Sequence, residues 1–132
     1  MNNSVILLFL VALLRATSGD TIADEFDNID IDEILSSKRL VDNYIHCFKT
    51  GQKCTPDGQK FRDVLPKAMK SKCEDCSPAQ REKVFKVVEW AAQNRPDDFL
   101  ELENIYDSQH EYRREFEAEL KQRNIALPPL RN

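Results

Sequence analysis

Apolar residues recur at three- and four-residue steps along most of this chain, which is the spacing of one face of an α-helix. Between the second and third cysteines, Phe61, Val64, Leu65, Ala68 and Met69 step by three, one, three and one residues. Similar apolar faces occur before and after this segment, and no stretch alternates as a strand does. The pattern predicts an all-α protein with about six helices.

Capping residues and prolines indicate where these helices begin. Such signals occur at Asp30–Glu33, Thr55–Gly58, Ser77–Gln80, Pro96 and Ser108–Glu111. A further helix is expected from Lys38 to Lys49, and Gly51 is a suitable residue to end it because glycine adopts the left-handed conformation without strain.

The N-terminus predicts export from the cell. Val5–Leu14 is an unbroken apolar run that matches a signal-peptide core and is too short to span a bilayer. Small residues before Ser18 and Gly19 favour cleavage after either one; a buried N-terminal strand or helix is the alternative. We therefore expect a signal peptide over residues 1–19, one helical domain over residues 20–122, and a flexible tail over residues 123–132.

The charge balance excludes two classes of partner. The formal net charge of the whole chain is −4, and removing the leader takes away one basic residue, Arg15, and no acidic one. A mature domain of this acidity is not expected to bind nucleic acid or an anionic membrane surface. No second long apolar run follows the leader, so we expect no membrane anchor.

All four cysteines lie within thirty residues, at Cys47, Cys54, Cys73 and Cys76. They allow three pairings, and the sequence alone does not choose among them. The helix between the two close pairs would span roughly 22 Å, whereas bridged α-carbons lie about 5–6 Å apart. Geometry therefore favours a bridge within each close pair.

Reactive and metal-binding roles for these cysteines are less well supported. The spacing of Cys73 and Cys76 suits thiol exchange, but Glu74 and Asp75 disfavour the thiolate and no βαβ pattern surrounds them. A four-cysteine zinc site usually has two tight pairs, and Cys47 and Cys54 are too widely spaced for that. We expect structural disulfides and no metal.

No catalytic group of residues is evident. His46 and His110 are the only histidines, and neither is near a Ser, Cys or carboxylate cluster at a useful spacing. The acidic residues from Asp24 to Glu33 lack the central glycine of a calcium-binding loop. We therefore expect neither an enzyme nor a cofactor.

A set of short segments around the cysteines forms a recognisable pattern from about Phe26 to Phe116. They are Phe26–Ile29, Asp32–Leu35, Arg39-Leu40 leading to Tyr44 and Cys47, Cys54–Gly58, Val64–Pro66, Cys76-Ser77 with Gln80, Tyr106-Asp107 and Tyr112–Phe116. Together with the cysteine spacing, these segments resemble the insect chemosensory proteins, also called olfactory-segment-D-like proteins.

The resemblance implies a compact superhelical bundle of six helices around an apolar channel, with bridges Cys47–Cys54 and Cys73–Cys76. It implies a monomeric carrier of long-chain apolar small molecules, such as fatty-acid-derived or pheromone-like compounds, in sensillar lymph or haemolymph. The family often has Tyr, Trp and Tyr where this chain has Phe26, Phe99 and Phe116, so a more purely apolar pocket is expected.

Candidate ligand-binding residues come from the apolar faces of the expected helices. They are Phe26, Ile34, Tyr44, Phe48, Phe61, Val64, Leu65, Val84, Val87, Val88, Phe99 and Leu102. Tyr44 also carries a hydroxyl, which suits either a contact with a ligand head group or an ordinary hydrogen bond within the core.

Two alternatives remain open from the sequence. The helix faces could fill the core against one another instead of enclosing a ligand. The protein could also be a secreted developmental or signalling factor that acts through a protein partner such as a receptor.

Overall fold

The structure is a computed structural model that describes residues 29–131. Within these residues it contains seven α-helices and no strand. The helices are α3 (Ile31–Ser36), α4 (Lys38–Thr50), α5 (Pro56–Ser71), α6 (Pro78–Asn94), α7 (Pro96–Tyr106), α8 (Glu111–Glu115) and α9 (Glu117–Gln122). The all-α prediction is confirmed. The expected signal peptide and Phe26 lie outside the described residues.

Side-chain caps hold the starts of four helices. Asp30, Ser37, Thr55 and Ser77 each accept a hydrogen bond from the backbone N–H three residues later, at 3.1–3.3 Å. The Gln80 side chain also accepts from the Ser77 backbone N–H at 2.7 Å, completing the predicted capping box. Because these interactions span only three residues, the sequence alone was sufficient to predict those at Asp30 and Ser77.

The last predicted capping box is wrong. The N-cap of α8 is His110, at φ 56°, and it makes no side-chain capping bond. The Asp107 carboxylate instead accepts from the backbone N–H groups of Glu111 and Tyr112, both at 3.0 Å. Asp107, with one carboxylate oxygen for each N–H group, thus takes the capping role that the sequence pattern assigned to Ser108. The expected single C-terminal helix is also divided at Phe116 into α8 and α9.

Both disulfides join cysteines that are close in the sequence. Cys47 and Cys54 link the last turn of α4 to the end of the loop before α5, with α-carbons 4.9 Å apart. Cys73 and Cys76 close the turn between α5 and α6, with α-carbons 5.1 Å apart. The pairing implied by the family resemblance is therefore confirmed, and neither bridge joins distant helices.

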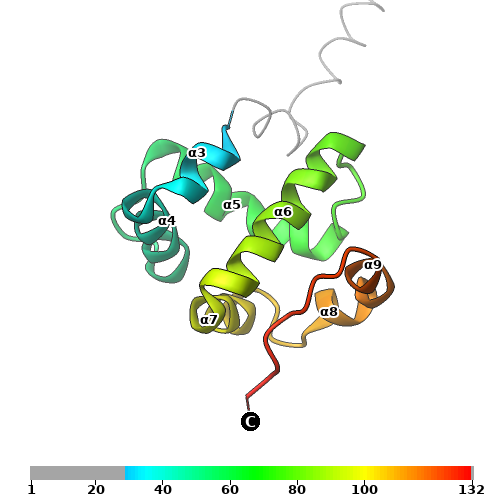
Figure 1. Cartoon of the computed structure of the whole chain (residues 1–132). Coiled ribbons are helices and arrows are strands. Elements are labelled where there is room, and N and C mark those ends of the chain that lie inside the picture. Colours follow the sequence, from blue (N-terminus) through cyan, green and yellow to red (C-terminus); the bar gives the residue numbers. More distant parts are fainter. Residues whose placement is uncertain (1–28, 132) are drawn as a thin grey trace, which may run out of the picture.

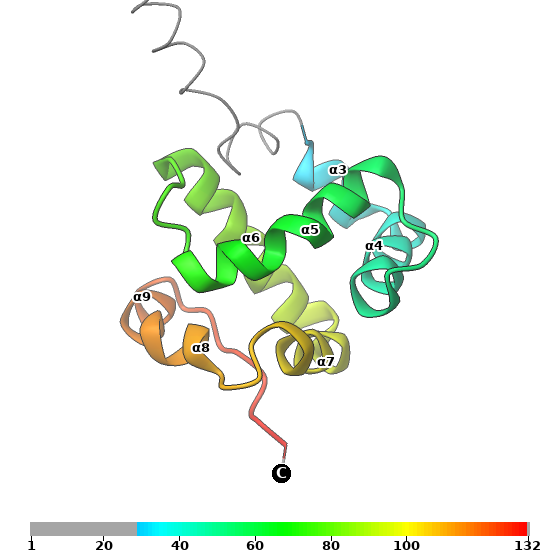
Figure 2. The same ribbon diagram turned by 180° about the vertical axis from the view of Figure 1, so that it is seen from behind.

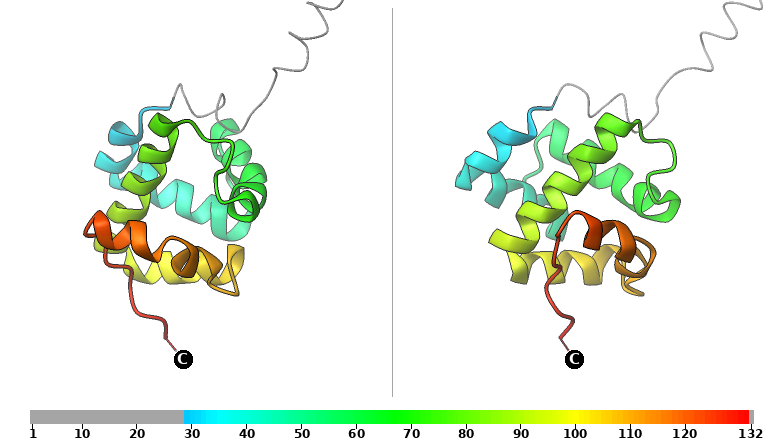
Figure 3. Two further views of the ribbon diagram at one scale, coloured as in Figure 1. Left: turned by 90° about the vertical axis from the view of Figure 1, so that its right-hand side faces the viewer. Right: turned by 45° about the vertical axis from the view of Figure 1, so that its right-hand side comes forward.

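The helices are arranged so that α5 and α6 occupy opposite faces of the domain (Figures 1 and 2). α4 packs against α3, α5 and α7, while α6 packs against α3 and α7. α5 and α6 make few close backbone approaches to each other, although both contact α7 (Figure 3). Their facing sides are therefore not packed helix against helix.

One cluster of buried apolar residues lies between α6, α9 and the C-terminal segment. It consists of Phe85, Phe116, Leu120 and Ile125, with Val88, Tyr112 and Leu127 packed around it. Val41, Cys47 and Ala92 are also buried. Within the segment expected to form a flexible tail, residues 123–132, Ile125 and Pro128 are both buried. α9 ends at Gln122, well before Pro128 and Pro129, and Ile125 and Leu127 in the segment between pack on the core.

Candidate functional site

Eleven of the twelve predicted ligand-binding residues lie within the described part of the chain, and none of them is fully buried. Val84 and Val87 on α6 are each 37% exposed, and the other nine are half-buried. A core filled to ordinary protein density would leave most such side chains inaccessible. The predicted apolar faces thus retain surface that a ligand could cover.

Three of the predicted residues form one aromatic cluster. Tyr44 and Phe48 are one helical turn apart on α4, and both contact Phe61 of α5. The ring centroids are separated by 5.9 Å for Tyr44–Phe48, 6.1 Å for Tyr44–Phe61 and 6.3 Å for Phe48–Phe61. Tilted and edge-on pairs at these distances are favourable, so the cluster forms an apolar wall between α4 and α5.

Tyr44 is held by its own surroundings. Burial raises the pKa of its hydroxyl, Asp57 raises it further, and a hydrogen bond with the Thr55 side chain opposes them. Its ring packs closely against Gly58. A Cβ atom added to Gly58 would lie 3.7 Å from the Tyr44 ring and 3.2 Å from the Thr55 hydroxyl. The Tyr44 hydroxyl therefore has a partner within the protein, the Thr55 side chain.

Charged side chains that the sequence did not single out place α7 against α4. Arg95 donates to Asp42 at 2.7 Å and to Asp98 at 2.8 Å, and Lys49 donates to Asp98 at 2.5 Å. The hydrogen bond from Lys49 is the main reason that the pKa of Asp98 is lowered. The Tyr106 hydroxyl adds a hydrogen bond to the Phe48 carbonyl at 2.5 Å.

These contacts fix the positions of two predicted ligand-binding residues on α7, Phe99 and Leu102. Phe99 follows Asp98 directly, and Leu102 lies one turn further along the helix. From the sequence, Asp98 is recognisable only as a charge at a helix start. No local signal shows that Lys49, from another helix, would reach it.

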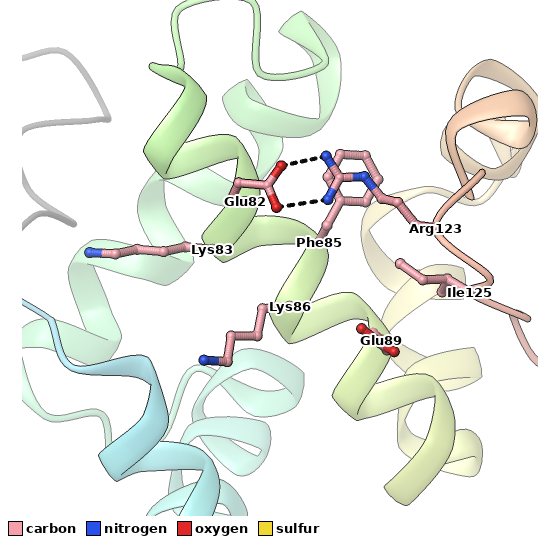
Figure 4. Close-up of a pocket in the computed structure, with 7 residues that line it drawn as sticks. All are labelled: Glu82, Lys83, Phe85, Lys86, Glu89, Arg123 and Ile125. Atoms are coloured by element: carbon pink, nitrogen blue, oxygen red, sulfur yellow. Dashed lines mark hydrogen bonds and ion pairs between the residues drawn. The ribbon is translucent and has the colours of Figure 1, made fainter. Parts of the chain in front are cut away.

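Two open surface grooves border the C-terminal segment, and more than half of the residues that line each groove are charged. The larger has a volume of about 530 Å³ and is lined by Glu82, Lys83, Phe85, Lys86, Glu89, Arg123 and Ile125 (Figure 4). Arg123 crosses it, donating to the Glu82 carboxylate at 2.6 and 2.9 Å while covering the Phe85 ring at 4.1 Å.

The second groove, of about 350 Å³, is lined by Arg113, Arg114, Glu117, Leu120, Lys121, Ile125 and Leu127. Neither groove contains a predicted ligand-binding residue. Both grooves are open to solvent, and an apolar chain lying there would take water from the charged side chains along them without offering those groups a partner.

Groups suited to metal binding do not occur within residues 29–131: no three or more His, Cys, Asp or Glu side chains come together there. Of the two histidines, His110 lies with Nδ1 at 3.2 Å from Glu103, whose carboxylate is also bound by Arg113 at 2.7 Å. No helix in the described part of the chain is long and apolar enough to cross a membrane.

Comparison with known proteins identifies the family of this chain. Residues 22–114 match the model of the insect pheromone-binding family A10/OS-D. Ejaculatory bulb-specific protein 3 of Drosophila melanogaster is 35% identical over 86% of this chain and 90% of its own. Putative odorant-binding protein A10 of the same species is 43% identical over 68% of this chain and 58% of its own.

A solved structure has the same fold. A chemosensory protein in complex with bromo-dodecanol superposes with a TM-score of 0.67 at 31% identity, covering 75% of this chain and 99% of that one. Together with the two local disulfides and the all-helical architecture, the match shows that this chain belongs to the insect pheromone-binding family A10/OS-D, the chemosensory proteins.

Proposed function

We propose that this protein is a secreted carrier that reversibly binds long-chain apolar molecules between the α4–α5 side and the α6–α7 side of the domain. The single observation that carries the proposal is the accessibility of the apolar faces on these helices, of which Val84 and Val87 are the clearest examples. The bromo-dodecanol complex of a structural relative supports a ligand with an alkyl chain of this kind.

The apolar character of the site sets a minimum ligand size. Micromolar binding requires about 8 kcal/mol, in addition to several kcal/mol of lost ligand freedom. A buried methylene contributes at most about 0.8 kcal/mol. A ligand held mainly by apolar contact therefore needs roughly twelve or more carbons, as in fatty-acid-derived or pheromone-like compounds.

Reversible binding is compatible with the way the helices are connected. Each disulfide closes a short turn, Cys47–Cys54 before α5 and Cys73–Cys76 after it. Neither bridge ties α5 directly to the body of α6, and these two helices pack mainly through shared neighbours. Helix positions can therefore adjust to chains of different length without breaking a covalent link.

Displacement of an apolar fluorescent probe by 1-alkanols of eight to sixteen carbons tests the proposal. We expect affinity to increase by about 0.5 kcal/mol per carbon, somewhat below the full methylene value, until the interior is filled. Affinity that is flat across the series, or absent for every alkanol, would contradict the carrier and favour a signalling factor with a protein partner. Native mass spectrometry of protein purified from its source would identify the lipid it carries.

A further inference from the structure

The hydroxyl of Tyr112 is buried and has no hydrogen-bond partner. Tyr112 lies on α8 with its ring 4.6 Å from that of Phe116, which in turn meets Phe85 edge-on at 5.9 Å. Most buried polar groups in native proteins are paired, so an unpaired one calls for an explanation. Burial also raises the pKa of Tyr112 to about 12, so the phenol is a hydrogen-bond donor at physiological pH.

Charged groups around Tyr112 do not supply the missing acceptor. Glu119 is the carboxylate whose negative charge raises the pKa of Tyr112. That carboxylate already accepts from Arg81 at 2.5 and 3.3 Å and from Arg123 at 3.2 Å. The two guanidinium groups have no acceptor atom, and they cover the Phe85 and Phe116 rings.

The position of Tyr112 connects it to the apolar face of α6. Val88, one of the predicted ligand-binding residues, packs against the same buried cluster as Tyr112. Val84 and Val87 neighbour Val88 on that helix and are accessible. The Tyr112 backbone N–H donates a hydrogen bond to the Asp107 carboxylate at 3.0 Å. This bond fixes the backbone from which the Tyr112 ring extends.

We propose that Tyr112 recognises the ligand's head group by donating a hydrogen bond to a neutral oxygen of a long-chain alcohol, aldehyde or ester. The inference rests on the proposed carrier function and specifies its ligand class. A neutral oxygen supplies the missing acceptor. A carboxylate would also accept, but its charge would be costly to desolvate, and the guanidinium groups of Arg81 and Arg123 are already paired with Glu119 and Glu82. Tyr44 is not equivalent, because its hydroxyl already bonds with Thr55.

The test is probe displacement by 1-dodecanol, dodecane and dodecanoate, using wild type, Tyr112→Phe and Tyr44→Phe. We expect Tyr112→Phe to weaken 1-dodecanol three- to tenfold and to change dodecane less than twofold. The matched Tyr44→Phe variant should not separate the two ligands. Wild type should bind 1-dodecanol more tightly than dodecanoate.

Thermal unfolding of the variants separates recognition from a structural role. Because Tyr112→Phe removes only an unpaired hydroxyl and keeps the ring, its melting temperature should be unchanged or higher. Equal effects on 1-dodecanol and dodecane, or none on either, would overturn the role of Tyr112 while leaving the carrier intact. Failure of wild type to bind any of the three compounds would overturn both proposals.

Discussion

Replacing Val87 by phenylalanine tests whether the accessible face of α6 borders the ligand. Val87 is 37% exposed, so a larger side chain can be accommodated without displacing a packed neighbour. Phenylalanine adds about four carbon atoms, which would occupy the space of about four ligand carbons. At about 0.5 kcal/mol per carbon, hexadecanol should bind about 2 kcal/mol more weakly, a loss of roughly thirtyfold.

The dependence on ligand length distinguishes this effect from general damage. Octanol should be affected little, because a short chain does not need the space that the ring occupies. The optimum of the alkanol series should therefore shift from about sixteen carbons toward twelve. The assay is displacement of a fluorescent probe at one temperature, with circular dichroism to confirm equal helix content.

Ile105→Phe provides the matched control. Ile105 lies on α7, is 52% exposed and is not one of the predicted ligand-binding residues. The Ile105→Phe variant should leave the affinity for every alkanol in the series unchanged. If Val87→Phe behaves like this control, or if it weakens every alkanol equally, then Val87 does not border the chain of the ligand and the proposed location is wrong.

Two further predictions concern stability. Ile125→Ala should lower the free energy of unfolding by about 2–4 kcal/mol because it opens a cavity in the core. Leu130→Ala, at an exposed position, should change it by less than about 0.5 kcal/mol. Equal small effects of the two changes in denaturant unfolding would contradict a stabilising role for Ile125 and favour a flexible tail. Burial opposes ionisation of Glu103, but hydrogen bonds from Arg113 and His110 outweigh it and lower its pKa. The stability this contributes is present above the unfolded-state pKa and is lost as pH falls through the lower folded value. Unfolding measured from pH 6 to pH 2 should therefore show a smaller loss for Glu103→Gln than for wild type, and an unchanged slope would contradict the assignment.

Local features of the sequence were sufficient for most of the helix starts and for the class of fold. Asp30 and Ser77 form their caps with residues three positions away, so neither depends on the rest of the molecule. Gly51 ends α4 in the left-handed conformation, at φ 73°, for the same local reason. The observed disulfides are likewise favoured by the cysteine spacing and by the length of the helix that separates the two pairs.

The candidate site was only partly accessible to sequence reasoning. Helical periodicity identified apolar faces, and the structure brings Tyr44, Phe48 and Phe61 together as one wall. Periodicity does not show how tightly two faces pack, because packing depends on the separation of helices distant in sequence. The accessibility of Val84 and Val87 is therefore information that only the fold contains.

The same distinction applies to the polar groups. The sequence by itself determined where most helices begin, which faces are apolar and that the two cysteine pairs are local, because these depend on neighbours within a few residues. Tertiary structure alone decided that Tyr44 is paired with Thr55 while the Tyr112 hydroxyl is left without a partner. It also decided that Ile125 enters the core, because burial and hydrogen bonding at these positions depend on segments brought together only by folding.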